Sequence, residues 1–78
     1  MHEREERAAI ETALKDAQGC IHEAMVRLSD AGSAAQKLYG ASAPLATQIT
    51  FAVTHSALLD GYLRDALGLI PPHSASNQ

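Results

Sequence analysis

Apolar residues recur at alternating steps of four and three in both halves of the chain. In the first half the row of positions is Ile10, Leu14, Ala17, Ile21, Ala24, Leu28 and Ala31. In the second half it is Leu45, Ile49, Ala52, Ser56, Leu59, Leu63, Ala66 and Ile70. A helix brings residues three and four apart onto one face, so this spacing predicts two amphipathic helices.

Two such rows can face each other if the chain folds back on itself. We therefore predict an all-α fold, an antiparallel hairpin of two long helices over residues 1–72, with 73–78 as a disordered polar tail. The expected hairpin core is Ile10, Leu14, Ile21, Leu28, Leu45, Ile49, Leu59 and Leu63. A two-helix hairpin has no layer over its open side, so we expect two copies to form a four-helix bundle.

The segment between the helices allows two interpretations. The first helix could end at Gly32, or it could continue to Tyr39 and stop at Gly40. We favour a bend near Gly32 followed by a short connecting helical turn. Ser42 is expected to cap the second helix, with Pro44 in its first turn, where a missing N–H costs nothing.

The second helix carries apolar residues on more than one face. A second stripe consists of Phe51, His55, Leu58, Tyr62 and Leu69, and Val53 is expected on a further face. The segment from Leu38 to Leu59 contains no Asp, Glu, Lys or Arg. Aromatic side chains in an uncharged patch are typical of binding hot spots. We therefore predict that this stripe binds a partner protein, forms the core of a homodimer, or does both.

Size and charge exclude several classes of function. A chain of 78 residues is too short to build a deep cleft beside a core. The net charge is −3 and the basic residues are scattered, so we expect no direct nucleic-acid binding. The first half places Glu four residues before several basic residues, as solvated helices often do. No apolar run reaches about 18 residues and the N-terminus is charged, so we expect a cytoplasmic protein without a membrane span or signal peptide.

The residues able to carry chemistry are not arranged for it. Cys20 and His22 are two apart on a helix and point in different directions, so we predict no metal and no cofactor. No base is placed beside Cys20 or Ser56, and Asp60 with Arg64 is expected to form a solvated pair. We therefore expect that the protein is not an enzyme.

The end of the second helix carries a resemblance to a known family. The run Ala66-Leu67-Gly68-Leu69-Ile70-Pro71, in which Gly68 is expected to follow the last helical turn, is similar to the C-terminus of the TraM antiactivators. The stretch from Ala13 to Leu28 resembles their first helix in pattern, and the shorter QseM antiactivators are closer in length. Together the likeness spans Ile10 to Pro71.

The resemblance implies a non-enzymatic protein that sequesters a LuxR-type quorum-sensing activator in conjugative transfer. It implies a dimerising helical hairpin whose C-terminal helix makes the contacts. Two other functions fit the residues: a secretion or assembly chaperone that shields a partner helix, and a purely structural helical homodimer.

Overall fold

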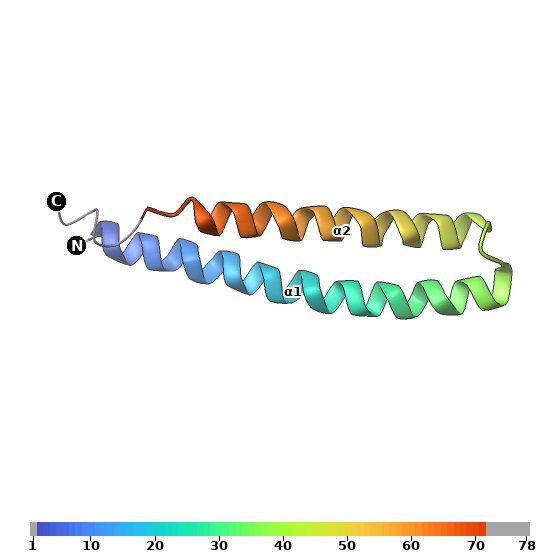
Figure 1. Cartoon of the computed structure of the whole chain (residues 1–78). Helices are drawn as coiled ribbons and strands as arrows, with labels where there is room; N and C mark the ends of the chain where they lie inside the picture. Colours follow the sequence, from blue (N-terminus) through green and yellow to red (C-terminus); the bar gives the residue numbers. More distant parts are fainter. Residues whose placement is uncertain (1, 72–78) are drawn as a thin grey trace.

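The protein is a hairpin of two antiparallel helices. The structure, a computed structural model, describes residues 2–71 and contains there α1 (His2–Tyr39) and α2 (Pro44–Gly68), which pack along each other (Figure 1). The predicted all-α hairpin is thus confirmed. The predicted tail, residues 73–78, lies outside the described residues.

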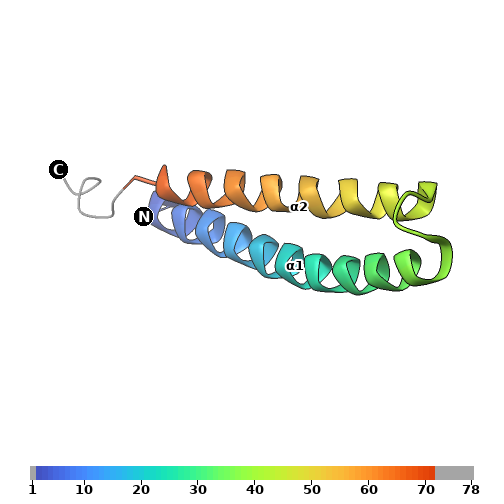
Figure 2. The same cartoon turned by 45° about the vertical axis from the view of Figure 1, so that its right-hand side comes forward.

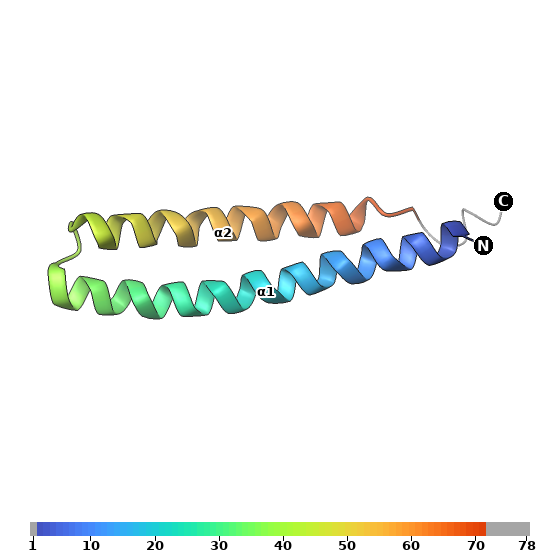
Figure 3. The same cartoon turned by 180° about the vertical axis from the view of Figure 1, so that it is seen from behind.

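The hairpin is long and open. α1 has 38 residues and α2 has 25, which correspond to helices of about 57 Å and 37 Å at about 1.5 Å per residue. The Cα atoms extend over 59 × 14 × 13 Å. The N-terminal end of α1 reaches beyond the end of α2 (Figure 1). Ile70 and Pro71 line one hollow together with Arg7 and Ile10 of α1. Views turned by 45° and by 180° show a single two-helix layer, with no further element of the described chain on either side (Figures 2 and 3).

α1 is continuous, so the expected bend near Gly32 is wrong. The helix runs to Tyr39 and ends at Gly40, whose φ of 96° is the only positive φ in the described chain and whose N–H donates to the Gln36 carbonyl oxygen at 2.9 Å. Gly32 instead serves helix packing. A Cβ atom at this position would lie 3.2 Å from Cγ2 of Ile49, so the missing side chain lets the two helices approach closely.

α2 begins without the predicted side-chain cap. The N-cap is Ala43 and no side chain caps the helix, so the prediction for Ser42 is wrong. Pro44 does occupy the first turn, as expected. The Thr47 N–H donates to the Ala43 carbonyl oxygen at 3.0 Å, which starts the helical hydrogen bonds. At the other end the helix includes Gly68, one residue further than expected.

The helices contact each other through rows of positions that are rotated from the predicted ones. In α1 the inward row is Leu14, Gln18, Ile21, Met25, Leu28, Gly32 and Ala35. In α2 it is Ala46, Ile49, Val53, Ser56, Asp60, Leu63 and Leu67, and Ile70 continues it beyond the end of the helix. The predicted core residues Leu14, Ile21, Leu28, Ile49 and Leu63 lie half-buried in these rows. Ile10, Leu45 and Leu59 do not, because their side chains are 54%, 52% and 47% exposed, and their prediction as core residues is wrong.

The observed rotation is accompanied by specific contacts between the two helices. The predicted row and the observed row of α1 share the large residues Leu14, Ile21 and Leu28. The residues beside these three therefore decide which row faces α2. In the observed row Gln18 donates to the Asp60 carboxylate at 3.3 Å, and Gly32, Ala35 and Ala46 lie at close contacts nearer the turn. Ala35 and Ala46 are 4% and 1% exposed, the only buried apolar residues of the described chain.

Candidate protein-binding surfaces

One side of the hairpin is polar and is organised around a buried carboxylate. Asp60 is 8% exposed and lies between the helices. Its Oδ1 accepts hydrogen bonds from His22 Nε2 at 2.8 Å and Gln18 Nε2 at 3.3 Å, and its Oδ2 accepts one from the Arg64 guanidinium at 3.0 Å. The predicted Asp60–Arg64 pair exists, but the prediction that Asp60 is solvated is wrong. Three donors satisfy the carboxylate, and two of them bring α1 to a fixed position along α2.

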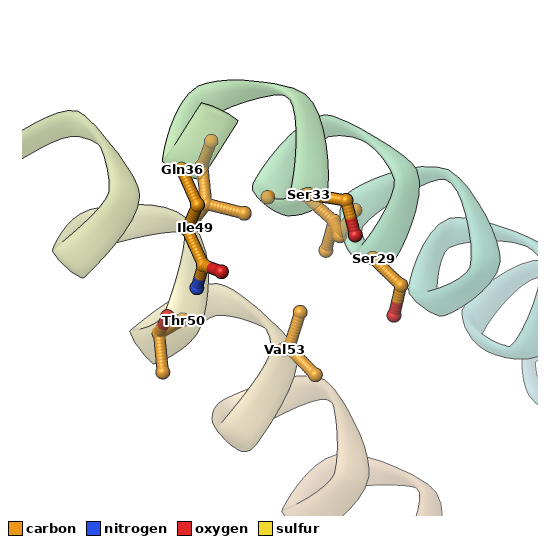
Figure 4. Close-up of a pocket in the computed structure, with 8 residues that line it drawn as sticks. Ser29, Ser33, Gln36, Ile49, Thr50 and Val53 are labelled. Carbon is orange, nitrogen blue, oxygen red and sulfur yellow. The ribbon is translucent and has the colours of Figure 1, made fainter. Parts of the chain in front are cut away.

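The same side continues towards the turn as a shallow polar hollow. Ser29, Ser33 and Gln36 of α1 border it opposite Thr50 of α2 (Figure 4). Val53, expected on a face of its own, lies at the helix contact and lines this hollow. The polar side is therefore defined by Lys15, His22, Ser29, Gln36, Thr50 and Arg64.

The opposite side of the hairpin is apolar from Ile10 to Leu38 of α1 and from Leu45 to Ala66 of α2. In two antiparallel helices, the positions that flank the contact on one side come from one row of each helix, spaced seven residues apart. On the side opposite His22 and Arg64 the α1 row begins with Glu3, and from Ile10 onwards neither row contains a charged or polar residue. We call this the apolar side, and it consists of Ile10, Ala17, Ala24, Ala31 and Leu38 of α1 with Leu45, Ala52, Leu59 and Ala66 of α2.

The large side chains of the apolar side are exposed. Leu38 is 74% exposed, Ile10 54%, Leu45 52% and Leu59 47%. A few exposed apolar residues are ordinary on a protein surface, but a continuous row of them indicates an interaction site.

The stripe predicted to bind a partner lies on the outer surface of α2, beside the apolar side. We call this second stripe the outer stripe, and it consists of Phe51, His55, Leu58, Tyr62 and Leu69. All five residues are exposed, and Tyr62 and Leu69 are 66% and 81% exposed. His55 Nδ1 donates to the Phe51 carbonyl oxygen at 2.7 Å, so this ring is held along the helix. The structure therefore places the five residues together on one accessible helix surface.

The groups considered for metal binding do not converge. Cys20 is exposed, whereas His22 points to Asp60 on the other helix. Within residues 2–71, no three His, Cys, Asp or Glu side chains are grouped so that they could hold a metal ion. In the same range neither helix combines the length and apolar character that crossing a membrane requires.

No family model, curated protein or solved structure matches the chain. A function must therefore be inferred from the two apolar surfaces and from the sequence.

Proposed function

We propose that this protein is a non-enzymatic antiactivator, which acts in the cytosol by binding a LuxR-type transcriptional activator and holding it in an inactive complex. The observation that carries the proposal is the outer stripe, an exposed and largely uncharged helix surface with two aromatic side chains. Aromatic residues contribute large contact areas at little cost in conformational entropy, so they are enriched among binding hot spots.

The dimensions of the outer stripe suit a helical partner. Phe51 and Leu69 are separated by about 27 Å along α2, because each residue rises about 1.5 Å. An amphipathic helix of similar length could lay its apolar face along this surface with anchors at steps of three and four residues. Binding of this kind inhibits a regulator if the complex is more stable than the regulator's active state.

Charge and sequence likeness support a regulator as the partner. Glu5 and Glu6 lie at the start of α1 in a chain of net charge −3, and such acidic groups attract the basic surface of a DNA-binding domain. The end of α2, from Ala66 to Pro71, is the part that resembles the TraM antiactivators. Leu69, within that part, is the most exposed large apolar residue of the described chain.

The proposal is tested by mixing the purified chain with purified LuxR-type activators and measuring both binding and release of operator DNA. Two tyrosines provide matched variants, since Tyr62 is 66% exposed on the outer stripe and Tyr39 is 65% exposed at the end of α1. We expect Tyr62→Ala to weaken binding about tenfold, a typical loss for an interface aromatic, and Tyr39→Ala to leave it unchanged.

Two results would contradict the proposal. One is that no LuxR-type activator encoded in the same genome binds the chain or loses its operator DNA. The other is that Tyr39→Ala weakens binding as much as Tyr62→Ala does.

A further inference from the structure

A single hairpin lacks an adequate hydrophobic core. No large side chain is fully buried, and the buried apolar residues of the described chain are two alanines, Ala35 and Ala46. Burial of apolar surface is the main favourable contribution to folding, and small domains have little of it to spare. A further surface must therefore cover apolar area that the two helices leave open to water.

The apolar side has the composition of a helix–helix interface. Leu38 and Leu45 lie together near the turn, Leu59 lies near the middle, and Ile10 lies at the far end of α1. Alanines occupy the positions between these large residues, at Ala17, Ala24, Ala31, Ala52 and Ala66. Small residues between large ones allow two helix pairs to approach closely while the large side chains interdigitate.

The area of this side matches the requirement of a stable interface. The apolar side runs about 42 Å along α1, from Ile10 to Leu38, and at a Cα width of 14 Å it covers about 600 Å², at the lower end of what each partner buries in a standard-size interface. The side runs along most of the molecule, so a second hairpin can cover all of it. A foreign protein would have to offer an equally long and flat apolar surface.

We infer that the apolar side is covered by a second copy of this chain, which forms a symmetric four-helix bundle with it. The pattern of the surface favours self-association, because large side chains lie at both ends and near the middle, and alanines lie between them. Turning the hairpin end for end reproduces this order, as an interface with two-fold symmetry requires. The interface contains no charged row that would select a different partner.

The dimer interface is distinct from the row of the outer stripe that includes Phe51 and Leu58. Leu58 and Leu59 are neighbours in sequence, with 52% and 47% exposure, but they point about 100° apart around α2. The homodimer therefore buries Leu59 and leaves Leu58 accessible. This inference does not depend on the proposed function, because it concerns the protein in the absence of any activator.

Sedimentation of the purified full chain tests the inference, with Leu58→Gln and Leu59→Gln as a matched pair. We expect the wild type to sediment at twice its monomer mass of 8.3 kDa. Leu59→Gln should weaken self-association by about 100-fold, because the leucine is buried once in each copy, and Leu58→Gln should leave it unchanged. Circular dichroism on the same samples follows folding, and loss of helix in Leu59→Gln upon dilution also supports the inference.

The inference would be overturned by a wild type that remains monomeric and helical at about 100 µM, far above the dissociation constant of a stable dimer. It would equally be overturned if Leu58→Gln dissociated the dimer as strongly as Leu59→Gln. Failure to bind an activator would contradict the proposed function alone, since sedimentation is measured without one.

Discussion

The two sides of the hairpin differ in how completely the chain supplies partners for its own side chains. On the polar side, His22, Gln18 and Arg64 converge on the Asp60 carboxylate, and no buried side-chain polar atom of the described residues lacks a hydrogen bond. On the apolar side the two helices cover the leucines only in part, and Leu38, Leu45 and Leu59 stay 74%, 52% and 47% exposed.

The difference shows that the chain provides all the partners its side chains need on the polar side but not on the apolar side. A buried polar group requires specific partners, and α1 and α2 provide them within one chain. Exposed leucines require only a surface that excludes water, which another molecule can provide. The polar side therefore fixes how the two helices pair, and the apolar side leaves leucine surface open for another molecule to cover.

The largest expected effect comes from separating the helices on which both sides depend. Gly32→Leu should lower the free energy of unfolding by about 2 kcal/mol, because its Cβ atom would lie 3.2 Å from Cγ2 of Ile49 and the larger side chain would overpack the helix contact. Gly19→Leu is the control, since a Cβ atom there meets nothing within 4 Å. It should stabilise α1 by about 1 kcal/mol through helix propensity. Urea denaturation measures both, and equal effects would contradict the close contact at Gly32.

A smaller effect is expected from the polar side alone. Asp60→Ala should lower the free energy of unfolding by about 1–2 kcal/mol, because it removes the acceptor shared by His22, Gln18 and Arg64. Asp65→Ala is the matched control on the exposed surface of α2 and should change stability by less than about 0.5 kcal/mol. If Asp60→Ala were as mild as the control, the polar side would not fix the pairing of the helices.

The smallest effect is expected for the most exposed ion pair of α1, Glu23–Arg27, which lies on neither side. Three pairs form with the predicted spacing: Glu3–Arg7, Glu11–Lys15 and Glu23–Arg27. In the third, the side chains are 66% and 76% exposed, so solvent screens the attraction. Glu23→Gln should change the free energy of unfolding by at most about 0.5 kcal/mol, and added salt should abolish the difference. A change above about 1 kcal/mol in urea denaturation would contradict this assignment.

The sequence predicts the hairpin correctly because steps of three and four are a local property of each helix. It does not predict which row turns inward. Leu14, Ile21 and Leu28 are compatible with an inward row of alanines beside them or with the observed row of Gln18, Met25 and Gly32. The choice depends on which residues meet across the helices, and that information is not contained in either helix alone.

The error at Asp60 has the same origin. Within α2 the residue has a basic partner four positions later, which indicates a solvated pair. Its burial depends on His22 and Gln18 of α1, about 40 residues earlier in the chain. The bend expected at Gly32 was also a local inference, whereas the glycine is explained by contact with Ile49 of the other helix. A local pattern can indicate that the outer stripe is exposed, because exposure depends on one helix, whereas binding of a partner there stays a prediction.

The central claim is that one hairpin cannot cover its own apolar side and that a second copy does so. The most direct test is the dependence of the thermal unfolding midpoint on protein concentration, followed by circular dichroism at about 1 to 100 µM. Because unfolding then separates two chains, we predict that the midpoint rises by several degrees over this range. A midpoint that stays constant, with helix content unchanged on dilution, would contradict the claim.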